Sequence, residues 1–171
     1  PVVSAFNRVV GWSEPFKENL QAICNVVEAA LEEELDRVIF ASSNHAVGMY
    51  EVENAPAIYE PDFDLEIDHT VTPRPDSMYG VTKVFGEGIG RFAAEAHGLK
   101  FYALRIGAVR EASYDHPYGD AERGVVEGKW ERGSEEYDEQ VTRMKAMWQS
   151  RRDLAQMIDQ CLQDETVTYD V

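Results

Sequence analysis

The chain has 171 residues, of which 44% are hydrophobic, and its 32 acidic residues outnumber its 16 basic ones. This length and composition suit one domain with a single buried core, spanning residues 1–171. The formal net charge of -16 argues against nucleic acid and anionic membrane as partners, because an acidic surface repels both. No apolar run approaches the length of a membrane-spanning helix, and no secretory signal is apparent, so we expect a cytoplasmic protein.

The charge balance also raises a hypothesis about the solvent to which this protein is adapted. Abundant carboxylates with only five lysines suggest a halophilic protein, since concentrated salt screens the repulsion between like charges. The alternative is an ordinary acidic cytoplasmic protein. Unfolding midpoints measured from low to molar KCl test the hypothesis, and a stability that stays flat across that range would contradict the halophilic interpretation.

Neither the cysteines nor the histidines form a metal-binding pattern. Cys24 and Cys161 lie far apart in helix-like sequence, so we expect two free thiols. The four histidines have no ligand spacing to one another or to a cysteine, and the sequence therefore predicts no metal site.

In chain order, the first predicted element is a helix from Ser13, which is expected to cap it, to about residue 34. Its apolar stripe consists of Leu20, Ile23, Val26, Val27, Ala30 and Leu31. A buried strand is predicted over Arg37–Ser43, because a β-branched and aromatic run leads into small polar residues. Asn44 and His45 are expected on the loop that leaves this strand.

A central helix is predicted after a long surface loop. The acidic, proline-containing stretch 50–72 indicates the loop, and Asp76 or Ser77 is expected to cap the helix. The helix should continue to about Ala96 and end at Gly98.

The glycine-rich segment 86–90 within this helix resembles part of a phosphate-binding loop. A phosphate-binding loop must follow a strand and open a helix, whereas this segment lies in mid-helix. We therefore expect these glycines to be close-packing positions, including a place where two such helices meet in a dimer.

The C-terminal part begins with a second buried strand over Lys100–Gly107, in which Arg105 should be paired if it is buried. Residues 111–139 show no clear period and predict an inserted loop or lid with Trp130 as its anchor. A helix and a terminal strand are predicted after it, over residues 150–162 and 166–171. Alternating helices and buried strands favour an α/β sheet that is covered on both faces.

Tyr79 and Lys83 stand four residues apart in the central helix, so their side chains should share one face. An ammonium group beside a phenol favours the phenolate, which gives an enzyme an oxygen base near neutral pH. Solvated helix faces also carry such pairs, and the spacing alone leaves that alternative open.

Three motifs in a fixed order make the pattern specific: Arg37–Gly48 with its two serines, Tyr79-x-x-x-Lys83, and Phe101–Gly107. Together they resemble the extended short-chain dehydrogenase/reductase superfamily, over about residues 13–171. Within it the chain looks like the uronate dehydrogenases and the archaeal NAD-dependent glucose-6-phosphate dehydrogenases. The resemblance implies a Rossmann-like, doubly wound parallel sheet and NAD as the cofactor.

The resemblance also implies a role for each site residue. Tyr79 is expected to be the general base, Lys83 to favour its phenolate and hold the ribose, and Ser43 to bind the reacting oxygen. The implied substrate-binding residues are Asn44, His45 and Arg143. The implied cofactor-binding residues are Asn19, Tyr79, Lys83 and Ile106. For Asn19 and Arg143, a solvated surface side chain is the alternative interpretation.

The sequence lacks the strand, the glycine-rich loop and the ribose-binding acid with which this superfamily begins. We therefore expect the chain to be the C-terminal part of an NAD(P)-binding fold, without its N-terminal βαβ half. Because the glycine-rich loop and the ribose-binding acid are absent, the sequence leaves the choice between NAD and NADP open, although the resemblance implies NAD.

The predicted function is NAD-dependent oxidation of the anomeric hydroxyl of a uronate or a sugar phosphate. The expected assembly is a homodimer that pairs through the helix carrying Tyr79 and Lys83. A sugar-nucleotide epimerase with the same two residues, and a non-catalytic relic of the fold, are the alternatives. Ala108 stands where uronate-specific relatives commonly carry serine, which weakens the case for uronate itself.

Overall fold

The computed structural model describes residues 14–171, which divide into two compact units. Within the described residues, unit 1 comprises residues 14–53, 66–105 and 158–171, and unit 2 comprises residues 54–65 and 106–157. None of the helices in this part of the chain is both long enough and apolar enough to cross a membrane.

Unit 1 is built on a three-stranded sheet in the order β1 (Arg37–Ser43), β2 (Lys100–Ile106) and β3 (Tyr169–Asp170). Strands β2 and β3 are parallel, with Phe101 opposite Tyr169. Ile106, the last residue of β2, is also the first residue of unit 2. The parallel pairing and the alternation of helix and strand confirm the predicted α/β class.

The terminal strand is shorter than the predicted 166–171, because a side-chain turn precedes it. The Asp164 carboxylate accepts hydrogen bonds from the backbone and hydroxyl of Thr166 and from the phenol of Tyr102. These bonds, led by that from the Thr166 hydroxyl, lower the pKa of Asp164. Burial, reinforced by the bond to Asp164, raises the pKa of Tyr102 to about 12. The turn thus fixes the point at which the chain enters the sheet.

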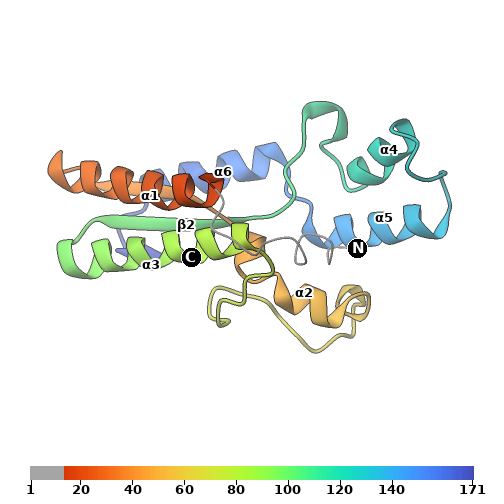
Figure 1. Ribbon diagram of the computed structural model, residues 1–171, viewed down its shortest axis with the longest axis horizontal. Helices are drawn as coiled ribbons and strands as arrows, with labels where there is room; N and C mark the ends of the chain where they lie inside the picture. The colour runs from red at the N-terminus through yellow and green to blue at the C-terminus, as the bar shows by residue number, and fades with distance from the viewer. Residues whose placement is uncertain (1–13) are drawn as a thin grey trace. The chain divides into compact units, whose positions relative to one another are not determined.

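Two long helices, α1 (Glu14–Glu32) and α3 (Met78–His97), lie side by side in unit 1 (Figure 1). Both contribute to the main core, which consists of Ile23, Val27, Ala30, Ala93, Ala94, Leu99, Phe101 and Ala103. Val26 belongs to the predicted apolar stripe, but it is 51% exposed. It lies about 100° around the helix from Val27, which is buried. The predicted cap at Ser13 lies outside the described residues.

The ends of α3 are as the sequence predicts. Ser77 caps it, since its Oγ accepts a hydrogen bond from the Gly80 backbone N–H at 3.1 Å. Gly98 ends it in the left-handed region with φ 75°, and its N–H donates to the Ala94 carbonyl.

Two glycines allow α3 to approach the sheet closely. A Cβ at Gly86 would overlap the ring of Phe40 in β1, and one at Gly90 would overlap the ring of Phe101 in β2. The predicted close packing is therefore confirmed at these two positions. A Cβ at Gly88 would meet nothing within 4 Å, so this glycine faces open space in the described residues.

The loop predicted over residues 50–72 is wrong at its start. Helix α2 (Met49–Asn54) and the short 3-10 helix η4 (Ala57–Tyr59) occupy that part of the chain. Glu53 at the end of α2 makes a double hydrogen bond with Arg74, which braces this helix from a distant part of the sequence. The sequence pattern missed α2 because it is too short to show a helical period.

Unit 2 contains α4 (Gly119–Val126), α5 (Glu135–Met147) and most of α6 (Arg151–Gln163), after the short 3-10 helix η5 (Ala112–Tyr114). Helices α4 and α5 lie side by side (Figure 1). The prediction of a loop over residues 111–139 is therefore wrong, because α4 and the start of α5 lie there. The helices there are short, and their apolar faces are small.

A small core of its own holds α4 against α5. Ala121, Tyr137 and Val141 are buried in it, with Val125 and Trp130 packed against them. The Trp130 indole N–H donates to the Ala121 carbonyl at 2.8 Å. The predicted role of Trp130 as an anchor is thus confirmed, although it anchors two helices and not a loop.

Candidate functional site

The candidate site of unit 1 lies where the end of β1 meets the first turn of α3. The chain leaves β1 through a 3-10 helix, η3 (Asn44–Ala46), which packs against α3. The Asp76 backbone N–H donates to the His45 carbonyl at 3.3 Å. A Cβ at Gly80 would overlap that same carbonyl oxygen, so glycine permits this close approach.

Lys83 and Tyr79 lie close together on α3, as their spacing predicts. The Lys83 Nζ is 5.2 Å from the centroid of the Tyr79 ring and 5.1 Å from that of the Phe40 ring. It also donates a hydrogen bond to the Ala41 carbonyl at 2.8 Å, which ties the side chain to β1. Tyr79 as a whole is 47% exposed.

Ser43 is buried at the end of β1 and caps η3. Its Oγ accepts a hydrogen bond from the His45 backbone N–H at 3.2 Å and donates to the Asn44 Oδ1 at 3.3 Å. Asn44 and His45 are both half-buried. The fold therefore brings Ser43, Asn44 and His45 to the start of the helix that carries Tyr79.

The structure also reveals a carboxylate at the site that the sequence marked only as a possible cap. Ser77 caps α3 and Asp76 does not, and the Asp76 side chain is only 2% exposed. It contacts the His45 Nδ1 at 2.8 Å through Oδ2 and 3.0 Å through Oδ1, and accepts from the Ser77 Oγ at 2.8 Å. A Cβ at Gly48 would overlap this carboxylate, so Gly48 makes room for it.

A second carboxylate, Glu87, follows Lys83 by one helical turn and joins α3 to two strands. It accepts a double hydrogen bond from Arg105 of β2, at 3.0 and 2.9 Å, and one from the Ser42 hydroxyl of β1 at 2.5 Å. The expectation that Arg105 is paired is thus confirmed. Its Nη1 is buried without a hydrogen-bond partner in the described residues. The sequence offered one signal for Glu87, its position one helical turn after Lys83, but no signal for its partners Arg105 and Ser42.

The remaining predicted site residues lie elsewhere. Asn19 is exposed on α1, and Ile106 is half-buried at the end of β2. Arg143 belongs to α5 in unit 2 and is half-buried there. Their roles stay predictions.

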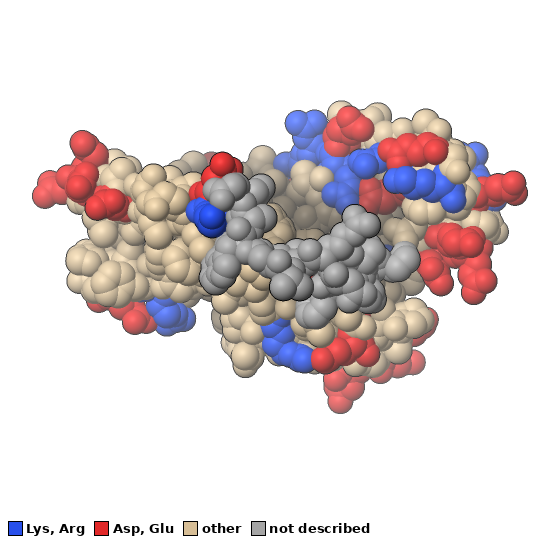
Figure 2. All heavy atoms as spheres, in the orientation of Figure 1, with Lys and Arg blue, Asp and Glu red and all other residues tan. Residues whose placement is uncertain are grey.

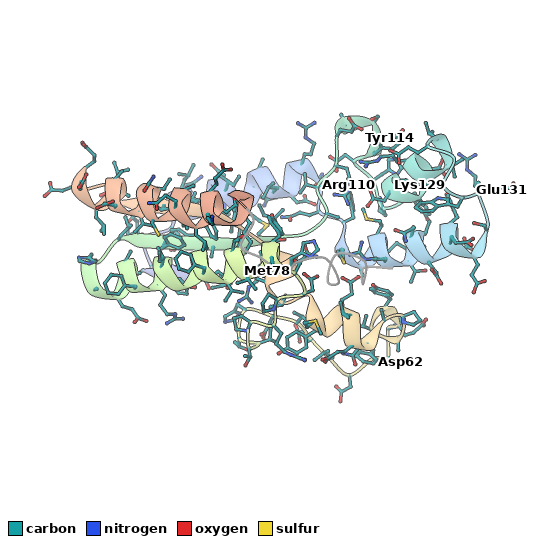
Figure 3. The ribbon with its side chains drawn as sticks, in the orientation of Figure 1. Asp62, Met78, Arg110, Tyr114, Lys129 and Glu131 are labelled. Atoms are coloured by element: carbon teal, nitrogen blue, oxygen red, sulfur yellow. The ribbon has the colours of Figure 1, made fainter. Side chains whose placement is uncertain are left out.

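Arg143 interacts electrostatically with a cluster of charged side chains in unit 2. The Arg110 guanidinium donates two hydrogen bonds to the Asp120 carboxylate, at 2.5 and 2.6 Å, and these bonds lower the pKa of Asp120. The positive charges of Arg123 and Arg143 lower it further. Figures 2 and 3 show basic side chains, among them Arg110 and the labelled Lys129, gathered with carboxylates around α4. Arg110, Arg123 and Lys129 line a pocket of about 400 Å³ there.

The described residues fit part of an NAD site. The Lys83 ammonium has three donors, and one of them is used on the Ala41 carbonyl. The geometry therefore leaves Lys83 able to bind the hydroxyls of a ribose while it stays beside Tyr79. NAD, when bound in such a site, supplies the acceptor for a hydride.

A Rossmann-like α/β sheet with a serine at a strand end and a Tyr-x-x-x-Lys helix beside it defines a class of nucleotide-dependent proteins. The chain belongs to the NAD-dependent epimerase/dehydratase family, whose model matches residues 12–163. NAD is the cofactor of this family, and the resemblance inferred from the sequence motifs is confirmed.

Two relatives and one solved structure illustrate the similarity. The chain is 30% identical over 164 residues to the NAD-dependent glucose-6-phosphate dehydrogenase of Haloferax volcanii, covering 94% of this chain and 54% of that protein. It is 39% identical over 121 residues to the L-arabinose 1-dehydrogenase (NAD(P)(+)) of the same organism, covering 70% and 48%. The uronate dehydrogenase structure from Agrobacterium tumefaciens shares the fold, with a TM-score of 0.61, 24% identity and coverage of 90% and 44%. The chain thus spans about half the length of the relatives it matches.

Proposed function

We propose that this protein is an NAD-dependent dehydrogenase of the short-chain type, which oxidises the anomeric hydroxyl of a uronate or a sugar phosphate. The observation that carries the proposal is the Lys83 ammonium beside the exposed ring of Tyr79, with its Nζ held 2.8 Å from the Ala41 carbonyl. The similarity to dehydrogenases named for glucose 6-phosphate and L-arabinose supports a sugar as the substrate class.

In this function each residue of the unit 1 site has a distinct task. The Tyr79 phenolate would take the proton of the anomeric hydroxyl as the C1–H bond of the sugar breaks and the lactone carbonyl forms. NAD, when bound, would supply the acceptor for the hydride that leaves C1. Lys83 favours the phenolate and holds the ribose. The Ser43 hydroxyl turns from Asn44 to donate a hydrogen bond to the reacting oxygen, while Asn44 and His45 orient the sugar.

The direct test is NADH formation by the natural full-length protein with a panel of aldoses, uronates and aldose 6-phosphates. Stoichiometric NADH with one class of sugar is the expected result. A sugar-nucleotide epimerase uses the same Tyr79 and Lys83 but returns its hydride to the sugar, so it yields no net NADH. A non-catalytic relic converts neither free sugars nor sugar nucleotides, and either result would refute the dehydrogenase.

Arg143 is proposed to bind the anionic group of the substrate. In a protein of net charge -16, an anionic sugar needs local cations at its site. A guanidinium holds a carboxylate or phosphate with two parallel hydrogen bonds, whereas lysine offers a point charge. We expect Arg143→Lys to raise the KM for an anionic sugar at least tenfold, or about 1.4 kcal/mol, and to leave the KM for a neutral aldose nearly unchanged.

The exposed Arg151→Lys serves as the matched control, because it makes the same substitution at the start of α6. It should leave both KM values unchanged. Equal changes for anionic and neutral sugars in Arg143→Lys would assign Arg143 to the fold of unit 2.

The homodimer is proposed to form through the outer face of α3. Val81, Phe85 and Phe92 are 37%, 38% and 63% exposed, and Gly88 between them faces open space. Their spacing of four, three and four residues forms one apolar stripe along the helix. Sedimentation should show that Phe92→Asp converts the dimer to a monomer, and an unchanged dimer would place the interface elsewhere.

A further inference from the structure

Asp76 and His45 form a side-chain pair whose chemistry the proposed roles do not use. The carboxylate is almost fully buried, yet its partner imidazole is 35% exposed and lies edge-on to the Tyr79 ring, with 5.7 Å between ring centroids. Asp76 lies two residues before Met78, which is labelled in Figure 3 at the start of α3. The pair therefore lies beside Tyr79, with the carboxylate buried and the imidazole ring partly exposed.

The buried carboxylate decides which nitrogen of the ring carries the proton. An ionised carboxylate only accepts hydrogen bonds, so the Nδ1 that lies 2.8 Å from Asp76 Oδ2 must be the protonated nitrogen. The positive end of α3, which begins two residues later, favours a negative charge at this position. In the neutral imidazole the other nitrogen, Nε2, is then a bare acceptor.

The neighbouring backbone keeps this arrangement fixed. The Ser77 Oγ holds the carboxylate at 2.8 Å, and the missing Cβ of Gly48 leaves room for it. The His45 carbonyl is tied to the Asp76 backbone N–H at 3.3 Å. Both residues of the pair are thus joined twice, through their side chains and through the main chain.

We propose that Asp76 is a positioning residue, which holds His45 with Nε2 as the acceptor for a hydroxyl group of the bound sugar. A bare Nε2 has no donor for the anionic group of the substrate, so the proposed partner of His45 is a neutral hydroxyl. This inference rests on the proposed dehydrogenase function. It assigns to His45 the recognition of a neutral hydroxyl and to Asp76 the control of its tautomer.

The test replaces Asp76 with asparagine in the natural full-length protein. In Asp76→Asn the amide oxygen should stay at the Oδ1 position, where the Ser77 hydroxyl donates to it, and the NH2 group should take the Oδ2 position 2.8 Å from Nδ1. The NH2 group then donates to Nδ1, so the ring proton should move to Nε2. Nitrogen-15 NMR of the histidine rings reports the tautomer directly, and His45→Gln assigns the His45 signals. We expect Nδ1 to be protonated in the wild type and Nε2 in the variant. A wild-type His45 with its proton on Nε2 would overturn the proposal.

Steady-state kinetics show whether the tautomer of His45 affects binding of the sugar. With the best sugar of the panel, Asp76→Asn should lower kcat/KM at least tenfold, chiefly through KM, while the thermal midpoint shows that the variant folds. In a His45→Gln background the same substitution should add less than a threefold loss, because Asp76 acts through His45. The exposed Asp62→Asn removes one negative charge elsewhere and should change neither constant. If the losses in kcat/KM of Asp76→Asn and His45→Gln multiply in the double variant, Asp76 acts independently of His45. That result would assign Asp76 a role in the fold and refute the proposal.

Failure of the dehydrogenase function is seen separately. If the wild type oxidises no sugar of the panel, both the dehydrogenase function and the proposed contact of His45 with a sugar hydroxyl are refuted. The ring spectra then still confirm or refute the control of the His45 tautomer by Asp76.

Discussion

Tyr79→Phe is expected to lower kcat for sugar oxidation by about 10²–10⁴-fold in the natural full-length protein, because it removes the proton acceptor and keeps the ring. Tyr79 is nearly half exposed, and the described contacts to its side chain are made by the ring. The substitution should therefore leave the thermal midpoint within a degree or two of the wild type. NADH formation at saturating sugar and NAD measures the loss.

The chain offers a matched control for this substitution. Tyr118 is 44% exposed and also lies beside a lysine, with the Lys145 Nζ 5.4 Å from its ring centroid. Tyr118→Phe should leave kcat unchanged, because the roles proposed above do not use this pair. A folded Tyr79→Phe variant that keeps near-normal turnover would refute the assignment of the base.

Glu87→Gln is expected to lower the free energy of unfolding by about 3–5 kcal/mol, since it leaves the Arg105 charge buried without a counter-ion. The side chains of Arg105 and Glu87 are 13% and 5% exposed, and the Nη1 of Arg105 already lacks a partner among the described residues. Urea titration of wild type and variant gives the difference. Because Glu87 also binds Ser42, the substitution loosens α3 from both β1 and β2.

The exposed pair on the same helix provides the control. Arg91 and Glu95 form an i,i+4 ion pair at 2.8 Å with more than half of each side chain exposed. Glu95→Gln should cost less than about 1 kcal/mol, because solvent screens an exposed pair. A double variant, Glu87→Gln with Arg105→Met, should be more stable than Glu87→Gln alone, since it removes the buried charge. Equal losses of unfolding free energy in Glu87→Gln and Glu95→Gln would show that the buried pair contributes no more stability than the exposed pair.

Local sequence patterns predicted correctly those helices and strands whose residue types or capping residues mark them directly. The strand over Arg37–Ser43, the serine cap and the glycine end of α3 agree with the structure, since β-branched runs and capping residues act within a few residues. Gly86 and Gly90 were also interpreted correctly, because a phosphate-binding loop needs a strand before it. The short helices α2 and α4 were missed, since six to eight residues show too little of a helical period.

The sequence by itself determined the α/β class, the family and the pairing of Tyr79 with Lys83, because fixed spacings along one helix and ordered motifs along the chain carry that information. Only the tertiary structure decided which distant side chains complete the site. Asp76 meets His45 across 31 residues, and Glu87 meets Arg105 and Ser42 across 18 and 45. Contacts of this kind depend on how helix and sheet pack, and no local spacing encodes them.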